Sequence, residues 1–306
     1  MTRILAITLN PSIDIACATD KVHPMLKTRT RDQMLDPGGG GTNVARVIAA
    51  LGGSPELVYL SGGSTGALYD SMLEELGLNT RRFPMAGSVR VSVMVREKVT
   101  DLEYRFVAEG AEVSEAELAP LMAHVEAFEG EYIIASGSLP RNVPVDTYAR
   151  MAASAEKKGI RFILDTAGEA LRETLKRAGV FLLKPSLHEL ELFVGRKLDE
   201  REIGDAATEL VTAGKAENVA VSLGREGALL ANDSGVLRVP SLHVKAVSAV
   251  GAGDSFVAAM TWRLSQGHDM HDAFRFGVAA GAAAVMTEGT QLCRREDVYA
   301  LYETMP

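Results

Sequence analysis

The alternation of short apolar strands with helices from Val113 onward restricts the fold of this chain more than any other feature. Strands are expected at 132–135, 161–164, 180–183 and 219–223, with helical segments between them. Strand–helix–strand units place successive strands in parallel, with helices on both faces of the sheet. The sequence therefore predicts an α/β fold, a doubly wound and mainly parallel sheet flanked by helices.

The first third of the chain adds a buried strand at 4–9 and a second, smaller β-sheet. Residues 82–95 and 103–107 alternate apolar with polar side chains and favour an antiparallel hairpin with one exposed face. With the segment after the first strand, they predict a small sheet that serves as a lid or a dimer surface. The 306 residues then form a single domain, with a β lid built from segments about 12–35 and 87–108.

A glycine turn near the C-terminus leads into an apolar helix. Residues 249–255 read Ala-Val-Gly-Ala-Gly-Asp-Ser, and the apolar run that follows predicts a helix beginning at or just after Asp254. Main-chain N–H groups of such a turn, together with the helix dipole, form an anion-binding site. Asp254 is then either an ordinary helix cap or a base that takes the proton of a substrate hydroxyl during phosphoryl transfer.

Four consecutive glycines at 38–41 precede a second, amphipathic helix. Such a run weakens the fold locally, so it indicates close approach of the backbone to another group. Its spacing matches neither the Walker A motif nor the dinucleotide fingerprint, which argues against an NAD-linked oxidoreductase. Asn43, at the expected helix start, is a cap, a hydrogen-bonding partner for a ligand, or both.

Polar residues follow several expected strands, at the edge where α/β sheets bind ligands. Asp14 is either a turn residue or an acceptor for a sugar hydroxyl. Asp165 ends one strand. Ser186 and Glu189 have the spacing of a capping box, with a magnesium-linked role for Glu189 as the alternative. The tight turn at 222–228 needs no function beyond joining two strands.

Basic residues recur in the two segments of the expected lid. Lys27, Arg29 and Arg31 alternate, so on a strand they would share one face. Arg90 and Arg105 lie on the second segment. Each of these side chains is either exposed to solvent or binds a phosphate group.

Charge and composition exclude several classes of partner. Lysine and arginine number 32 against 40 aspartate and glutamate residues, and the formal net charge of −8 argues against nucleic acid or a membrane surface. Cys17 and Cys293 have no metal-ligand or redox spacing, so free thiols in a reducing cytosol are expected. None of the six histidines is paired at metal-ligand spacing. With no signal peptide and no stretch of 18 apolar residues, we expect a soluble, cytoplasmic protein.

The two glycine motifs together resemble the signatures of the ribokinase-like (PfkB-type) carbohydrate kinase family. The likeness runs from Ile4 to about Tyr302. Within the family, the chain is similar to the minor-type bacterial 6-phosphofructokinases at residues 9–14, 38–43, 104–107 and 289–293.

This resemblance implies an ATP- and magnesium-dependent kinase that phosphorylates the C1 hydroxyl of fructose 6-phosphate to give fructose 1,6-bisphosphate in glycolysis. Relatives that act on fructose 1-phosphate or tagatose 6-phosphate usually carry a lysine within the glycine run, and here the run has none. 1-Phosphofructokinase and tagatose-6-phosphate kinase stay as alternatives, and a non-catalytic sugar-phosphate-binding protein is the alternative of another class. The resemblance also implies a homodimer formed through the β lid.

The resemblance implies roles for individual residues as well. Asp254 matches the catalytic base, and the amides of Gly251, Ala252 and Gly253 match the site of the transferred phosphoryl group. Ser186 stands where the family has an asparagine in its magnesium motif, and Glu189 matches the acidic member, acting directly or through water. Lys27 also matches a position tied to inhibitory ATP binding.

The other implied site residues fall into three groups. The family's positions for the sugar phosphate correspond to Asp14, Gly39, Gly40, Asn43, Arg90 and Ser138, with Lys27, Arg29 and Arg105 as further candidates. The positions for the nucleotide correspond to Lys184, Ser186, Ser222, Gly224 and Gly227. The positions for a potassium-like ion correspond to Ser248, Val250, Ala284 and Gly289.

Overall fold

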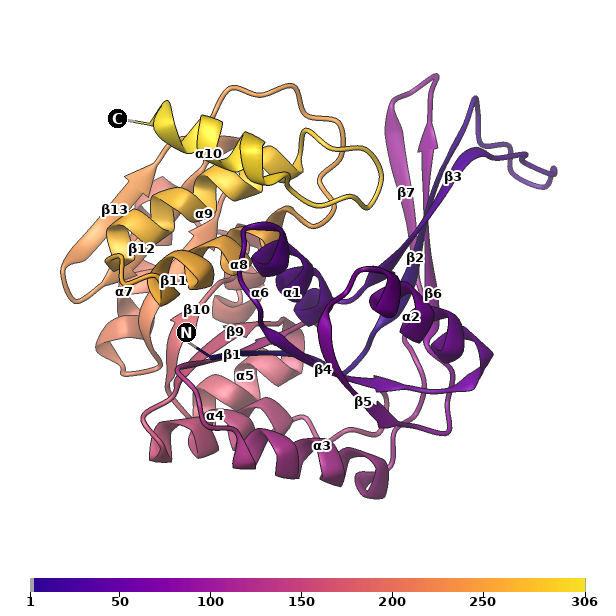
Figure 1. Ribbon diagram of the computed structural model, residues 1–306. Coiled ribbons are helices and arrows are strands. Elements are labelled where there is room, and N and C mark those ends of the chain that lie inside the picture. The colour runs from indigo at the N-terminus through magenta and orange to yellow at the C-terminus, as the bar shows by residue number, and fades with distance from the viewer. Residues whose placement is uncertain (1–2, 306) are drawn as a thin grey trace.

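A large sheet with mainly parallel strands runs through the body of the molecule (Figure 1). The computed structural model describes residues 3–305, and within them the strand order is β13-β12-β11-β10-β9-β8-β1-β4-β5. Pairing is parallel from β5 to β11, whereas β12 and β13 are antiparallel. The predicted fold class is confirmed. The strands are β1 (Ile4–Thr8), β4 (Glu56–Ser61), β5 (Asn79–Pro84), β8 (Tyr132–Ser136), β9 (Arg161–Asp165), β10 (Val180–Leu183), β11 (Ala216–Ser222), β12 (Ala228–Asn232) and β13 (Gly235–Val239).

Helices cover both faces of this sheet. In Figure 1, α8, α9 and α10 pack beside α1 on one face, while α3, α4 and α5 run along the other. The apolar helix α9 is buried against α8, with the Phe256 and Phe274 rings 5.8 Å apart. None of the helices within residues 3–305 is long and apolar enough to cross a bilayer. The helices are α1 (Gly40–Ala50), α2 (Gly63–Glu75), α3 (Glu115–Ala127), α4 (Thr147–Lys157), α5 (Gly168–Arg177), α6 (Leu187–Val194), α7 (Glu200–Thr212), α8 (Ala252–Ser265), α9 (Met270–Ala284) and α10 (Arg295–Glu303), with a short 3₁₀ helix at Gly224–Glu226.

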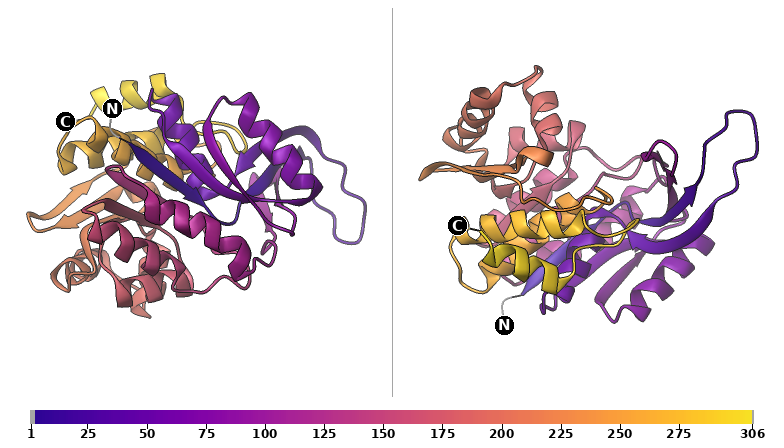
Figure 2. Two further views of the ribbon diagram at one scale, coloured as in Figure 1. Left: turned by 60° about the horizontal axis from the view of Figure 1, so that its bottom comes forward. Right: turned by 90° about the horizontal axis from the view of Figure 1, so that it is seen from above.

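A separate small sheet projects from this body (Figure 2). Its strands follow the order β3-β2-β6-β7, where β2 is Ser12–Thr19, β3 is Arg31–Gly38, β6 is Arg90–Glu97 and β7 is Leu102–Val107. β6 and β7 form the predicted antiparallel hairpin, and β2 pairs in parallel with β6.

Two details of the predicted small sheet are wrong. The expected strand at 82–95 is divided, because β5 pairs in parallel with β4 at the edge of the large sheet and buries Phe83 there. Lys27 and Arg29 lie in the exposed loop 21–30 rather than on a strand. Pro24 stands in the turn of this loop, and proline has no N–H for a strand ladder.

The glycine run at 38–41 brings the start of α1 against the carboxyl ends of β1 and β8. A Cβ atom on Gly40 would lie 2.2 Å from the Ser136 Oγ, and one on Gly41 would lie 2.1 Å from the Ile7 carbonyl oxygen. Side chains therefore have no room here, which explains the consecutive glycines. The corner between β3 and α1 is thereby fixed at the ligand-binding edge of the sheet.

We predict that Gly41→Ala destabilises the fold by at least about 2 kcal/mol, because the added methyl group overlaps main-chain atoms of β1. Gly204→Ala is the matched control, since its Cβ would meet nothing closer than 3.8 Å inside α7. Alanine there is expected to stabilise by about 0.5–1 kcal/mol, because glycine is a poor helix former. Denaturant unfolding measures both effects, and equal midpoints for the two variants would refute the packing argument.

Candidate active site

Asp254 lies in the first turn of α8 and does not cap it. The helix begins at Ala252, two residues earlier than expected, and its N-cap is Gly251 with a φ of 71°. Glycine adopts this left-handed conformation readily, so the loop can end and the helix can begin before the aspartate. The carboxylate therefore sits near the positive end of the helix dipole, beside the turn at 251–253.

Asn43 reaches Asp254 from the other glycine-led helix. Its Nδ2 donates to Oδ2 of Asp254 at 2.8 Å, and the Ser136 Oγ lies 3.5 Å from the other carboxylate oxygen. Asn43 is not the cap of α1, because the helix begins at Gly40 and its N-cap is Gly39. The structure thus brings together two residues that the sequence separates by 211 positions.

The surroundings of Asp254 raise the pKa of its carboxyl group above the ordinary value for an aspartate. Burial raises its pKa to about 6, and the nearby Asp165 carboxylate acts in the same direction, while the Asn43 hydrogen bond and Lys184 oppose the rise. Such a group is ionised at neutral pH and still accepts a proton readily. A buried carboxylate with this pKa can act as a general base.

Lys184 and Asp165 form an ion pair beside this turn. The Lys184 Nζ lies 3.1 Å from the Asp165 Oδ1, and the Ser136 Oγ donates to the other carboxylate oxygen at 3.3 Å. A Cβ atom on Gly253 would lie only 3.2 Å from the Lys184 Nζ, so the ammonium group faces the glycine turn. Burial opposes the charged form, but the Asp165 and Glu189 carboxylates raise the pKa of Lys184 above its ordinary value.

Asp165 is a residue of this site to which the sequence assigns no role. Its local sequence marks it only as the polar end of a strand. Its position at the carboxyl end of β9, next to the lysine that follows β10, is the signal that could have found it.

The residues predicted to hold the sugar phosphate gather between the two sheets. Asp14 accepts a hydrogen bond from the Ser12 Oγ at 2.6 Å, and burial raises the pKa of Asp14 above its usual value. Ser138 accepts from the Asn10 Nδ2 at 3.1 Å. Gly39 and Gly40 belong to the corner described above.

Arg90 is held at the same place by main-chain carbonyl groups. Its Nη2 donates to the Asn10 oxygen at 3.1 Å and its Nη1 to the Ala108 oxygen at 2.8 Å. The Nε atom is buried and has no partner within residues 3–305. The Nε donor of the guanidinium group is therefore unused.

The remaining basic candidates are not part of this group of residues. The loop that carries Lys27 and Arg29 extends away from the large sheet (Figure 1). Arg105 is exposed and forms an ion pair with Glu103 at 3.0 Å. In the described part of the chain, no hydrogen bond or ion pair joins these three side chains to the Asp254 neighbourhood.

The predicted nucleotide residues lie at the carboxyl ends of β10 and β11. Ser222 donates its main-chain N–H to the Pro185 oxygen at 3.0 Å, which places Ser186 and Ser222 side by side. The Ser186 and Glu189 capping box is confirmed, with the Ser186 N–H donating to the Glu189 Oε2 at 2.7 Å. Gly224 and Gly227 form the turn that follows, and both have positive φ angles.

The donor set near Glu189 fits a magnesium ion that arrives with phosphate. Within residues 3–305, no three His, Cys, Asp or Glu side chains are arranged to hold a metal alone. Mg²⁺ commonly keeps several waters and takes only one or two carboxylates together with substrate phosphates. Glu189 is the carboxylate that the family resemblance offers for such an ion, and its Oε2 also accepts from the Ser186 N–H.

The four residues of the predicted potassium-like site come from two adjacent segments. The Ser248 N–H donates to the Val285 oxygen at 3.3 Å, which joins the loop before α8 to the end of α9. The Val250 N–H donates to the Ser248 Oγ at 3.3 Å, while the Ala284 oxygen accepts from Thr287. Gly289 packs against the small sheet.

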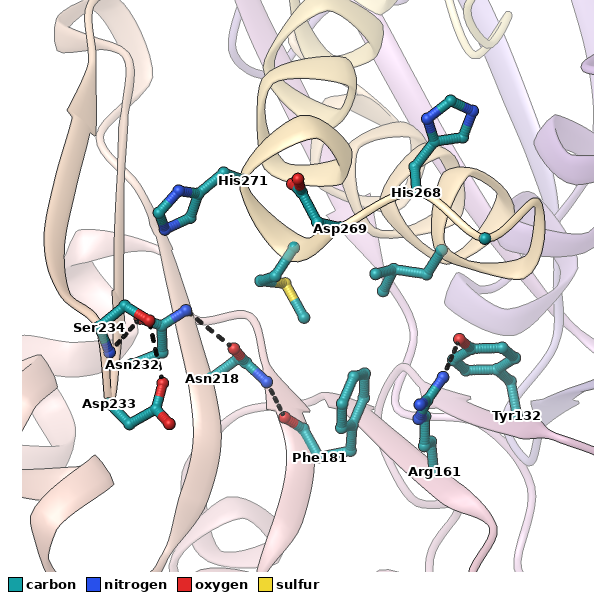
Figure 3. A pocket seen from close by; sticks show the side chains of 13 residues that line it. Tyr132, Arg161, Phe181, Asn218, Asn232, Asp233, Ser234, His268, Asp269 and His271 are labelled. Atoms are coloured by element: carbon teal, nitrogen blue, oxygen red, sulfur yellow. Dashed lines mark hydrogen bonds between the residues drawn. The ribbon is translucent and has the colours of Figure 1, made fainter.

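Two cavities lie at the opposite, amino edge of the large sheet, away from Asp254. Their volumes are about 610 and 510 Å³, and Arg161, Phe181 and Asn218 line both. Figure 3 shows that polar side chains in the first cavity bind one another, because Asn218 bridges the Phe181 oxygen and Asn232. These cavities are separate from the candidate active site.

Comparisons with known proteins agree with this geometry. The family model described as pfkB family carbohydrate kinase matches residues 1–297. The chain is 43% identical to the ATP-dependent 6-phosphofructokinase isozyme 2 of Mycobacterium tuberculosis, over 98% of this chain and 89% of that protein. It is 39% identical to the isozyme 2 of Escherichia coli (99% and 98% covered) and 31% identical to the 1-phosphofructokinase of Bacillus subtilis (93% of each).

Solved structures give the same result. Phosphofructokinase-2 from Escherichia coli in complex with fructose-6-phosphate has a TM-score of 0.93 at 37% identity, covering 100% of this chain and 99% of that one. The same enzyme in complex with potassium has a TM-score of 0.94 at 39% identity, covering 99% of each chain.

We predict that Asp254→Asn stabilises the protein at pH 8. The pKa of Asp254 is raised from 3.8 to about 6, so the folded state binds the proton more tightly than the unfolded state. Stability therefore falls as pH rises from about 4 to 6, and the asparagine variant escapes this loss of about 1–3 kcal/mol. Urea unfolding at pH 8 and pH 4 measures the difference. A gain that is the same at both pH values would contradict the shifted pKa.

Proposed function

The chain belongs to the pfkB family of carbohydrate kinases, and we propose that it transfers the γ-phosphoryl group of ATP to the C1 hydroxyl of fructose 6-phosphate. The observation that carries this function is the Asp254 carboxylate beside the glycine turn, with Asn43 and Lys184 against it. The 39–43% identity to two 6-phosphofructokinases, against 31% to a 1-phosphofructokinase, supports the substrate.

Asp254 acts as the base in this reaction. A new bond forms between the C1 hydroxyl oxygen and the γ-phosphorus, while the bond from that phosphorus to the bridging β–γ oxygen breaks. The hydroxyl proton passes to the Asp254 carboxylate, and ADP leaves with the bridging oxygen. Because the pKa of Asp254 is about 6, the base is ready at neutral pH.

Three features stabilise the charge of the transferred group. The amides of Gly251, Ala252 and Gly253 stand at the start of α8, where the helix dipole favours an anion. The Lys184 ammonium group faces the same turn. Preorganised donors of this kind supply most of the catalysis in phosphoryl transfer.

Kinases of this family use ATP with a divalent metal ion, and we assign Glu189 to magnesium here, directly or through water. The ion would neutralise phosphate charge when bound. Ser186 replaces the family asparagine, and its hydroxyl is engaged in the α6 cap. Ser222, Gly224 and Gly227 form the edge on which the nucleotide would lie.

The sugar phosphate would occupy the space between the two sheets. Asp14 and Asn43 provide hydrogen-bonding groups for the sugar, with Gly39, Gly40 and Ser138 beside them. The unused Nε donor of Arg90 suits a phosphate oxygen. A cytoplasmic location, as expected from the sequence, is part of this proposal.

A monovalent cation is part of the proposal. The potassium complex of the similar Escherichia coli enzyme supports a site at Ser248, Val250, Ala284 and Gly289. Ser248 and Val250 lie in the loop that leads into α8, and the Ser248 N–H joins this loop to Val285, next to Ala284. An ion there would hold the anion-binding turn in place.

We further propose a homodimer through the outer face of the small sheet. Leu35 pairs with Ile15, and Phe106 with Val93, so these four apolar side chains share one face across all four strands. Leu35 is 44% exposed and Phe106 is 62% exposed. Asp14 points to the other face because side chains alternate along a strand. An apolar face of this kind suits a second copy of the chain.

A substrate panel tests the function. Coupled ADP release is measured with fructose 6-phosphate, fructose 1-phosphate and tagatose 6-phosphate, and kcat/KM is compared. Fructose 6-phosphate is expected to rank first by about tenfold or more, because the chain's likeness to 6-phosphofructokinases exceeds its likeness to the others. A tenfold advantage for another substrate would make the assignment wrong.

Asp254→Asn is the control for chemistry in the same assay. Its amide keeps the shape of the side chain but cannot take a proton, so kcat is expected to fall by about three orders of magnitude or more with little change in KM. Activity within tenfold of the wild type would remove Asp254 from the role of base. Binding of sugar phosphate without any turnover by the wild type would instead indicate a non-catalytic binding protein.

Phe106→Glu is expected to give a monomer, because a charge would be buried in the proposed interface. Val236→Glu, which changes an apolar residue 52% exposed on β13, is the matched control and should keep the wild-type mass. Multi-angle light scattering at several concentrations measures both. Wild-type mass for Phe106→Glu would exclude this face as the dimer contact.

A further inference from the structure

A continuous series of polar contacts runs from the loop after α9 to the proposed base. The Thr290 Oγ1 donates to the Asp36 Oδ2 at 2.6 Å, and the Arg46 Nη2 donates to the Asp36 Oδ1 at 2.8 Å. The Arg46 Nη1 lies 3.4 Å from the Asn43 Oδ1. Asn43 then donates to Asp254 at 2.8 Å. Five side chains from four separate segments are linked in this way.

The series is shielded from solvent. The Arg46 side chain is 13% exposed and that of Asp36 is 18% exposed, while Thr290 and Asn43 are buried. Surface ion pairs contribute little because water screens them, but a shielded arginine–carboxylate pair holds its geometry. The position of the Arg46 guanidinium group is therefore well defined.

Arg46 determines which end of the Asn43 amide faces Asp254. A guanidinium group only donates hydrogen bonds, so it takes the amide oxygen and leaves the NH₂ group toward the carboxylate. With the amide reversed, an oxygen would meet the carboxylate and an NH₂ group would meet Arg46. Both contacts would then be unfavourable.

Other contacts keep Arg46 in this position. Its Nη1 also donates to the Pro37 carbonyl oxygen at 3.0 Å, at the end of β3. The Thr290 hydroxyl holds the Asp36 carboxylate that receives the Nη2 donor. The neighbouring Gly289 packs on Met34 and Ala16, where a Cβ atom would lie within 2.9 Å of both, so the loop and the small sheet are tightly joined.

We propose that Arg46 is a positioning residue for the base, held by Asp36 and Thr290, and that it acts by fixing the orientation of the Asn43 amide. This inference rests on the proposed function, because it takes Asp254 as the group that accepts the proton. Since Asp36 belongs to β3, the arrangement also links the position of the small sheet to the state of the base.

The test compares Arg46→Gln and Arg46→Lys with the wild type. The pH titration of the Asn43 side-chain amide, followed by nuclear magnetic resonance of asparagine-labelled protein, reports the ionisation of Asp254 without any substrate. The pH profile of kcat/KM for ATP-dependent phosphorylation of fructose 6-phosphate gives the second readout. Asp165, Lys184 and Asp14 also face Asp254, and none of them changes in these variants.

For Arg46→Gln we expect the amide titration to move upward by about one pH unit, because the carboxylate loses an oriented donor. At pH 6.5 this shift lowers the ionised fraction of Asp254 about threefold, so kcat/KM should fall by about threefold or more there and recover toward the wild-type value at pH 9, where the base is again ionised. Arg46→Lys should behave similarly, because one ammonium group cannot satisfy Asp36, Pro37 and Asn43 together.

Arg263→Gln is the matched control. Arg263 forms a comparably shielded ion pair with Asp272 at 2.6 Å, with side chains 18% and 23% exposed, at the other end of α8. Loss of this ion pair should lower thermal stability without moving the Asn43 amide titration or the pH profile of kcat/KM.

If an Arg46 variant folds poorly, Thr290→Val and Thr290→Ser are used in its place. Serine keeps the hydroxyl that holds Asp36, and valine removes it. Valine should then raise the titration midpoint, and serine should leave it unchanged.

An unchanged titration and pH profile in Arg46→Gln, or full recovery in Arg46→Lys, would overturn the proposal, because the second result would assign the effect to charge alone. If instead the titration moves in Arg46→Gln while the wild type phosphorylates no sugar phosphate, the proposed function fails and the orienting role of Arg46 stands.

Discussion

The hydrogen bond from Asn43 to Asp254 joins the two halves of the site, and the rest of the structure serves to make that contact possible. Each residue lies near the start of a helix that follows a glycine turn. Side chains at Gly40 or Gly41 would collide with the ends of β8 and β1, and one at Gly253 would press on Lys184. The glycines therefore allow α1 and α8 to begin at one sheet edge, close enough for their side chains to meet.

The charges around this contact explain how an acidic protein can bind two phosphorylated ligands. The chain carries a net charge of −8, yet the groups facing the glycine turn include Lys184 and the dipole of α8. Acidic neighbours serve a different purpose, because burial with Asp165 nearby raises the pKa of Asp254 to about 6 and makes it a better base. Local arrangement, rather than overall charge, decides what can bind.

The features that depend on local sequence could be predicted, and those that depend on distant contacts could not. Strand and helix alternation predicted the large sheet, and residue spacing predicted the capping box at Ser186. The start of α8 was misplaced because Gly251 ends the loop in a left-handed conformation. Asp165 and Arg46 have ordinary sequence surroundings, and only their partners across the fold reveal them.

We propose that Asp254 takes the proton of the acceptor hydroxyl beside a phosphoryl group held by the glycine turn. A crystal structure with fructose 6-phosphate and a non-hydrolysable ATP analogue would show both groups in place. We expect a carboxylate oxygen about 2.6–3.2 Å from the C1 hydroxyl oxygen, with the terminal phosphate against the amides of 251–253. A carboxylate that points away from that hydroxyl, with neither a water nor a modest side-chain rotation able to connect them, would contradict it.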